Sequence, residues 1–169
     1  EHKRIQNLCR CAIFRSDFLE NLEEFQNFTI SGMNCIIRSF QSCPEDYIDW
    51  IVDLTARNMM CFYKDAWGWS TKSKQFEVME EDACFLIAVI GDNPIGFIHF
   101  KFEEQDNMFT LFIYNIEVAE EYQKNGLGTF LMSAVESIGK EIKVDCLMTM
   151  LFKANELGLE FFRKNGFIS

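Results

Sequence analysis

Two glycines shortly after a glutamine carry the clearest chemical signal in this sequence, in the order Gln123-x-x-Gly126-x-Gly128. An apolar helical pattern starts at Leu127, so the glycines leave backbone N–H groups uncovered at a helix N-terminus. Such a terminus has free donors and the positive end of a dipole, and it suits a phosphate. The glycine spacing fits neither a dinucleotide fingerprint nor a Walker loop, and the same residues also suit an ordinary helix start.

The strand and the helix on either side of this loop must position it. Residues 109–118 are mostly β-branched, aromatic or aliphatic, which predicts a buried strand. The helical pattern after the loop runs over 127–140. Beyond it we expect a strand at 146–151, a helix at 155–164 and the beginning of another strand at 167–169.

The first half of the chain supplies the remaining elements. Residues 1–28 are expected to be helical, with Ser16 capping a second segment, and their apolar face should pack on the domain. A long periodic helix is predicted to start at 42–45 and to end near Lys64. The other expected elements are strands at 33–40, 83–90 and 95–103 and a short polar helix at 70–80.

A pair of tryptophans, Trp67-Gly68-Trp69, lies between the long helix and the short one. Two indole rings in a loop can close an edge of the core, or they can line a substrate-binding wall. The sequence alone leaves both interpretations open.

Length and composition indicate one domain spanning residues 1–169, because 49% of the residues are apolar and can build a single sizeable core. No apolar run approaches 18 residues, so we expect no membrane association. No signal peptide is visible, although the chain begins at Glu1 rather than Met. The 7 cysteines are scattered without a C-x-x-C pair, which predicts reduced core residues, no metal site and a cytoplasmic or nuclear location.

The formal net charge of −10 argues against binding nucleic acid through a basic face. It is compatible with a cationic partner such as a basic peptide, and equally with a solvated acidic surface. We expect a monomer.

The order of these elements, with the glycine loop after the fourth strand, resembles that of the GCN5-related (GNAT) acyltransferases. Their Gln/Arg-x-x-Gly-x-Gly/Ala loop holds the pyrophosphate of coenzyme A. The resemblance implies an α/β fold with a mixed central sheet flanked by helices, whose C-terminal strands are apparently missing here. Their Asn-x-x-Ala-x-x-Phe-Tyr-x-x-x-Gly-Phe segment is similar to Asn155-x-x-Gly158-x-x-Phe161-Phe162-x-x-x-Gly166-Phe167.

Over residues 47–167 the chain more closely resembles the NatD type of N-alpha-acetyltransferase. That type acetylates the N-terminal amine of histones whose tails begin Ser-Gly-Arg-Gly. The most discriminating motif is Trp67-Gly68-Trp69. The other matching motifs are Asn58-Met59-x-x-x-Tyr63, His99-Phe100-x-Phe102, Gly126-Leu127-Gly128-x-Phe130-Leu131, Phe152-Lys153-x-Asn155 and Phe161-Phe162-Arg163.

The resemblance implies two sets of binding residues. A strand edge would pair with the pantetheine arm of acetyl-CoA, the glycine loop would hold the pyrophosphate, and an asparagine would bind near the thioester. These cofactor positions are Ile116, Glu117, Val118, Lys124, Asn125, Gly126, Leu127, Gly128, Thr129 and Asn155. On the substrate side, Tyr63, Trp67 and Tyr114 match aromatic positions of the peptide site. Glu103 matches an acidic position that receives the substrate arginine.

Several positions depart from the family pattern. The second acidic position of the substrate pocket is Gln105, and one aromatic position is Phe112 rather than tyrosine. The glutamate proposed as general base falls on Asn115, which takes no proton near neutral pH. Glu117 lies two residues further, on the same face of the strand, and could serve directly or through water; an exposed strand residue is the alternative. Phe162 stands where many members carry a general-acid tyrosine.

We therefore predict an acetyl-CoA-dependent enzyme that acetylates a basic protein N-terminus, with Glu117, Tyr114 and Asn115 as its catalytic group. The amine would attack the thioester carbonyl directly, while the protein aligns the reactants, accepts a proton and stabilises the oxyanion. One alternative is a GNAT enzyme for lysine side chains or small amines. Another is a non-catalytic acyl-CoA-binding module, motivated by Asn115 and Phe162.

Overall fold

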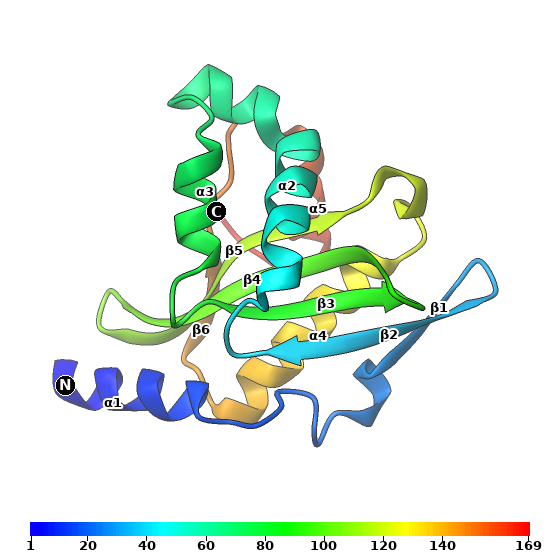
Figure 1. The fold of residues 1–169 in the computed structure, drawn as a ribbon. Helices are drawn as coiled ribbons and strands as arrows, with labels where there is room; N and C mark the ends of the chain where they lie inside the picture. Colours follow the sequence, from blue (N-terminus) through cyan, green and yellow to red (C-terminus); the bar gives the residue numbers. More distant parts are fainter.

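A six-stranded mixed sheet separates two layers of helices (Figure 1). The computed structural model describes residues 1–169. The strands follow one another across the sheet in chain order, and only the last pair is parallel. The strands are β1 (Asn27–Ile30), β2 (Met33–Phe40), β3 (Cys84–Ile90), β4 (Asn93–Gln105), β5 (Met108–Val118) and β6 (Cys146–Thr149). The helices are α1 (His2–Ile13), α2 (Glu45–Ala66), α3 (Thr71–Val78), α4 (Leu127–Ile142) and α5 (Glu156–Lys164), with 3₁₀ turns η1 (Glu23–Phe25) and η2 (Glu120–Tyr122).

The two faces of the sheet carry separate apolar cores. Helices α2 and α3 cover one face, and α1 and α4 cover the other (Figure 1). On the α4 face, Leu86 and Ile98 are buried with Leu131; on the α2 face, Phe97 is buried with Ile51. None of the helices combines the length and the apolar character that crossing a lipid bilayer requires. The layered α/β architecture with a mixed sheet confirms the predicted fold class.

The N-terminal segment corrects the prediction of helix over residues 1–28. Only α1 is an α-helix there, and the second helix that Ser16 was expected to cap does not form. Phe18 and Leu19 are nevertheless fully buried. They lie in a turn in which the Asp17 carboxylate accepts the Leu19 N–H at 2.8 Å. The apolar spacing therefore reports burial of this segment and not a helical backbone.

Strand β1 is an element that the sequence pattern conceals. Leu22, Phe25 and Phe28 have helical spacing, but β1 pairs with β2 in an antiparallel hairpin. Ser31 and Gly32 have φ angles of 50° and 76°, the geometry of a tight two-residue hairpin turn. The backbone hydrogen bonds of β1 are made with β2, so the helical spacing of the apolar residues does not predict the conformation of this strand.

The end of the chain holds a second correction. Residues 167–169, expected to begin another strand, form none. Instead the Phe167 N–H donates to the Phe162 carbonyl at 3.1 Å, and Gly166 has a φ of 88°. This is the pattern of a helix C-terminus closed by a left-handed glycine, so these residues complete α5.

A β-bulge in β5 determines which side chains face which helices. The register pairs Phe100 with Ile113 and His99 with Asn115, so Tyr114 is an extra residue. Leu111 before the bulge belongs to the core on the α4 face. After the bulge the alternation is inverted, because one extra residue exchanges the faces. Asn115 and the residues that follow it at spacing two therefore point towards α2 and α3.

Candidate active site

A cleft of about 1070 Å³ opens where β5 and β6 part. β6 pairs with β5 only from Thr110 to Ile113, so β5 has no neighbouring strand on that side over 114–118. Residues 113–118 and 149–153 line the two sides of the cleft, and α2 and α5 contribute further residues. An unpaired strand edge offers backbone donors and acceptors to an extended ligand.

The glycine loop lies at one end of this cleft. Gly126 has a φ of 86° and precedes the first residue of α4, where no side chain caps the helix. Gly128 lines the cleft itself. Asn125 holds the loop in shape by donating to the carbonyls of Tyr122 and Gln123 at 3.3 and 3.0 Å. The free N–H groups of the first turn of α4 are thus available to an anion.

The other predicted loop residues are distributed around this turn. Lys124, Asn125 and Thr129 are exposed, whereas the side chain of Leu127 is buried in the core. Leu127 therefore contributes only backbone to the loop. Together with the backbone of 116–118, this arrangement fits an elongated ligand whose extended arm leads to a pyrophosphate, as the pantetheine arm of coenzyme A does.

Replacing Gly126 by valine is expected to weaken coenzyme A binding. The substitution strains a left-handed position and places a branched side chain over the free donors of α4. We expect a Kd roughly tenfold higher, equivalent to about 1.4 kcal/mol, in calorimetric titration of the folded protein. Gly91→Val is the matched control, because Gly91 also has a positive φ and lies in the β3–β4 turn. Equal affinity of the two variants would contradict the assignment.

Asn155 lines the cleft, but one of its polar atoms is engaged in capping α5. Its Oδ1 accepts the Gly158 N–H at 2.9 Å, and its Nδ2 lies 4.0 Å from the sulfur of Met59. A Cβ on Gly158 would approach Asn155 Nδ2 to 2.6 Å. Glycine at 158, where the related pattern has alanine, therefore leaves room for this capping conformation, and Nδ2 stays available to a ligand.

Glu117 is a buried carboxylate at the floor of the cleft, with only 6% of its surface exposed. Asn58 of α2 donates through Nδ2 to Glu117 Oε2 at 3.0 Å and to the Val118 carbonyl at 3.1 Å. Burial raises the pKa of Glu117 to about 7, although the hydrogen bonds and the charge of Lys74 oppose the rise. A carboxylate that titrates near neutral pH is suited to general-base catalysis.

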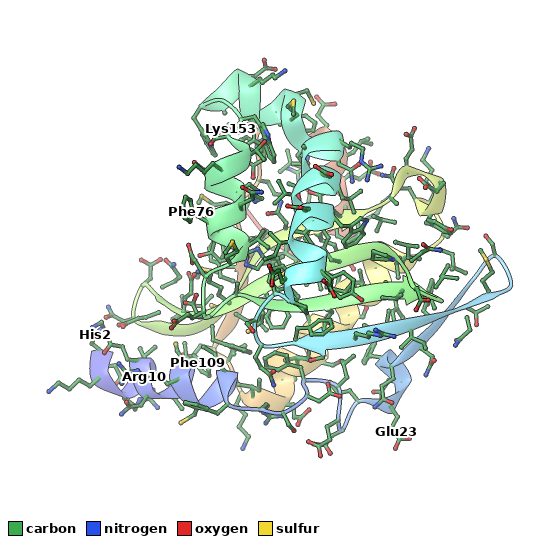
Figure 2. The ribbon with its side chains drawn as sticks, in the orientation of Figure 1. His2, Arg10, Glu23, Phe76, Phe109 and Lys153 are labelled. Carbon is green, nitrogen blue, oxygen red and sulfur yellow. The ribbon has the colours of Figure 1, made fainter.

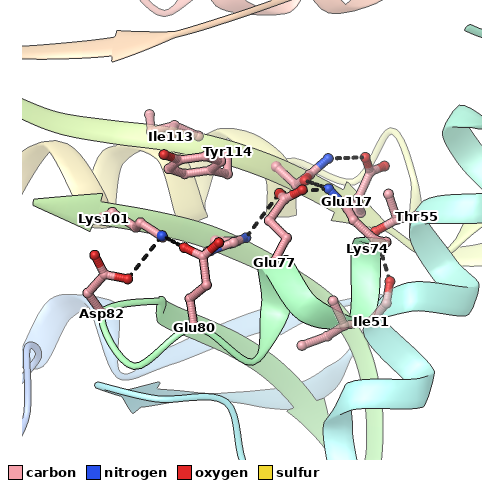
Figure 3. A network of polar contacts seen from close by, with 12 residues as sticks. Ile51, Thr55, Lys74, Glu77, Glu80, Asp82, Lys101, Ile113, Tyr114 and Glu117 are labelled. Atoms are coloured by element: carbon pink, nitrogen blue, oxygen red, sulfur yellow. Dashed lines mark hydrogen bonds and ion pairs between the residues drawn. The ribbon is translucent and has the colours of Figure 1, made fainter. Parts of the chain in front are cut away.

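Asn115 connects Glu117 to a buried lysine that sequence reasoning missed. Its Nδ2 donates to Glu117 Oε1 at 3.5 Å, and its Oδ1 accepts from Lys74 Nζ at 2.6 Å. Lys74 and Val78 are the two buried residues of α3, and their spacing of four is the only sequence signal for this orientation. Figure 3 shows Lys74 beside Glu117 and Glu77.

Tyr114 faces away from the base. Its hydroxyl donates to Glu103, and its pKa lies above the usual range because of burial and then this contact. Lys101 Nζ lies 5.3 Å from the centre of the Tyr114 ring. The tyrosine therefore stays protonated near neutral pH and cannot itself accept a proton.

The two polar substrate positions lie apart from the main cleft. Gln105 Nε2 donates to Glu103 Oε2 at 2.9 Å. Glu103 lines a second hollow of about 730 Å³ between β4 and α1. Neither Glu103 nor Gln105 lines the main cleft, and a hydrogen bond from the Tyr114 hydroxyl connects Glu103 to a residue that does. The structure thus places Glu103 behind an aromatic ring.

Aromatic side chains form the outer wall of the cleft. The rings of Trp67 and Phe152 are 5.0 Å apart, and the rings of Tyr63 and Phe152 are 4.9 Å apart. Phe112 lines the same cleft. Trp67 is 75% exposed at the rim, whereas Trp69 packs against the core on the α2 face. Trp69 therefore closes an edge of the core, and Trp67 lines the cleft, where a role in substrate binding stays a prediction.

His99 is a fully buried ring next to this wall. It lies between Phe85 and Tyr114, with ring centres 4.5 and 5.0 Å away. Burial, and secondarily the charge of Lys74, lower the pKa of His99 to about 3. The ring is therefore neutral at physiological pH. No group of three histidine, cysteine or acidic side chains is arranged to hold a metal ion.

Comparison with known proteins gives a consistent result. The model of the acetyltransferase (GNAT) family matches residues 47–167. A possible acetyltransferase from Clostridium difficile 630 superimposes with a TM-score of 0.64 at 16% identity, over 80% of this chain and 91% of that one. An aminoglycoside N-acetyltransferase in complex with CoA gives a TM-score of 0.61 at 17% identity, over 84% and 93%. A ribosomal-protein-alanine N-acetyltransferase from Brucella melitensis biovar Abortus 2308 gives 0.60 at 13% identity, over 80% and 93%.

Proposed function

The chain belongs to the acetyltransferase (GNAT) family, and we propose that it acetylates the N-terminal α-amino group of a basic peptide, such as a histone tail beginning Ser-Gly-Arg-Gly. Enzymes of this family use acetyl-CoA, which supplies the acetyl group as a thioester. The observation that carries the proposal is the buried carboxylate of Glu117 at the floor of an aromatic-walled cleft.

The residues of this chain suggest how the acetyl donor is held. The N–H groups at the first turn of α4, from Leu127 to Thr129, would bind the pyrophosphate. The unpaired edge of β5 over 116–118 would bind the pantetheine arm through backbone groups. Asn155 Nδ2, left free by the helix cap, would donate near the thioester end.

Glu117 would accept the proton of the attacking amine. A free α-amine has a pKa of about 8, and the pKa of Glu117 is about 7, so transfer between them is nearly balanced. The hydrogen bonds donated by Asn58 and Asn115 would stabilise the ionised Glu117 carboxylate until it accepts the proton. With Phe162 buried in the core, no tyrosine at that position can return a proton to the leaving thiolate.

The charge and shape of the cleft support a cationic peptide as the acceptor. The acidic lining residues Glu77, Glu117 and Glu120 outnumber the basic ones, Arg57 and Lys153 (Lys153 is labelled in Figure 2), and the net charge of the chain is −10. The aromatic wall of Tyr63, Trp67 and Phe152 would pack on the backbone of an extended N-terminus. A polar small molecule would leave this apolar wall without a complementary surface.

Thioester turnover with three acceptors tests the proposal. The acceptors are a peptide beginning Ser-Gly-Arg-Gly, the same peptide blocked at its N-terminus with a lysine added, and an aminoglycoside. We expect turnover with the free N-terminus only. Transfer to the blocked peptide or to the aminoglycoside would assign a different amine class, and no turnover with any acceptor would contradict the proposal.

Glu103→Ala separates arginine recognition from a structural role. If Glu103 pairs with the arginine at the third position, its loss should raise KM for a Ser-Gly-Arg-Gly peptide by roughly tenfold, as for a charge-assisted pair of about 1.5 kcal/mol. A peptide with alanine at the third position should show a far smaller change. Equal changes for the two peptides would mean that Glu103 acts only by holding the Tyr114 hydroxyl.

A further inference from the structure

All three N–H groups of the Lys74 ammonium have acceptors, and these come from three different elements. Lys74 Nζ donates to Asn115 Oδ1 of β5 at 2.6 Å, to Glu77 Oε1 of its own helix at 2.9 Å and to the Tyr63 hydroxyl of α2 at 3.3 Å. The side chain is only 4% exposed. A buried lysine whose three N–H groups all have acceptors is held in one conformation, so the side chains that accept from it are held in place as well.

The ammonium determines which way the Asn115 amide points. An ammonium only donates, so the amide oxygen must face Lys74, and the amide nitrogen must then face Glu117. A rotated amide would set its N–H groups against the ammonium and its oxygen against the carboxylate. The contacts thus form a chain in which the lysine holds the amide and the amide donates to the base.

We propose that Lys74 is a positioning residue for acetyl transfer, which fixes the Asn115 amide as a donor to Glu117 and leaves the proton of the Tyr63 hydroxyl free to point into the cleft. The inference rests on the proposed role of Glu117 as base. Because the Tyr63 hydroxyl already accepts from Lys74, its own O–H is available to a carbonyl of the bound peptide. Lys74 thereby positions both the general base and a hydrogen-bond donor for the peptide, and it contacts neither substrate itself.

The surroundings of Glu117 leave Lys74 as the cation that acts on it most directly. His99 of β4 is neutral at physiological pH, and Tyr114 of β5 stays protonated. The charge of Lys74 lowers the pKa of Glu117 against the effect of burial. The other charged or titratable side chains facing this region are Arg57 and Tyr63 from α2, Glu77 from α3, Lys101 from β4, Glu120 from η2 and Lys153 from the segment after β6.

The test compares Lys74→Met with Lys72→Met in kcat measured from pH 5.5 to 9. Methionine keeps an unbranched side chain, one atom shorter than lysine, and removes the charge, and Lys72 is an exposed lysine of the same helix. We expect the acid limb of kcat to move up by about one pH unit in Lys74→Met, since a nearby cation lowers a carboxyl pKa by about that much or more. At pH 6.5 this is a loss of roughly five- to tenfold, and Lys72→Met should match the parent.

A second variant and a titration keep the inference separable from the role of Glu117. Asn115→Leu retains Lys74 but interrupts the chain, and it should move the acid limb in the same direction. ¹³C NMR of the Glu117 carboxyl should show its titration at higher pH in both variants, whether or not Glu117 is the base. An unchanged titration would overturn the inference. An acid limb that persists in Glu117→Gln would instead overturn the proposed base.

Discussion

Glu117→Gln is expected to lower kcat by roughly ten- to a thousandfold, within and just below the usual range for a general base. Glutamine keeps the size of the side chain and its contact with Asn58, but it accepts no proton. The affinity for acetyl-CoA should stay within a factor of about two, because residue 117 would contribute only backbone to that site. Steady-state kinetics with calorimetry of acetyl-CoA binding measures both.

The pH profile gives this prediction a second readout. In the parent, kcat should fall on the acid side of about pH 7 as Glu117 becomes protonated. In the variant that limb should be absent, and the remaining dependence should follow the amine. Glu121→Gln, at an exposed position of η2, is the control and should behave as the parent. If Glu117→Gln kept the kcat and the profile of the parent, water would be the proton acceptor.

The same substitution should stabilise the fold at alkaline pH. Burial raises the pKa of Glu117 from 4.5 to about 7, so between these values the native state keeps a proton that the unfolded chain releases. The stability of the parent therefore falls as pH rises through this window. Glutamine is always neutral, so at pH 8.5 the variant should be more stable by about 2 to 3 kcal/mol, close to a hundredfold in the unfolding equilibrium.

Urea denaturation at pH 8.5 and at pH 4.5 measures this difference. At pH 4.5 the parent carries a protonated Glu117, so the two proteins should have nearly equal free energies of unfolding. Glu121→Gln should show no such pH-dependent difference, because its carboxylate is exposed. A variant that is less stable than the parent at pH 8.5 would mean that the carboxylate contributes net stability through its hydrogen bonds.

The sequence predicted well those features that depend on local order. The glycine loop, the helix after it and the strand before it have their predicted places, because turn chemistry and periodicity act over a few residues. Asn115 and Glu117 share a face, as a spacing of two predicts, and their side chains are in contact. Local patterning was thus enough to place the elements that line the candidate site.

Long-range contacts were beyond local patterning. Asn58 and Lys74 reach Glu117 and Asn115 from α2 and α3, across separations of 59 and 41 residues. In the sequence, Lys74 lies in a short polar helix, where a lysine is ordinarily exposed. The prediction of helix over 18–28 was wrong for a related reason. The end of this segment forms β1 by pairing with β2, and the spacing of apolar residues does not reveal a contact with another strand.

Because of the bulge at Tyr114, the number of residues in β5 determines which of its polar side chains face the cleft. Deleting Tyr114 itself would remove the bulge and leave Glu117 on its present face, whereas deleting Ile116, between Asn115 and Glu117, would turn the Glu117 side chain towards α4. After the deletion of Ile116, the carboxylate of Glu117 would enter the apolar core on the α4 face. Deletion of Ile116 would therefore cost both activity and folding, whereas a substitution at 116 that keeps the number of residues would leave the carboxylate on its present face. The face that each polar side chain of β5 takes is thus set by the number of residues in the strand as well as by their types.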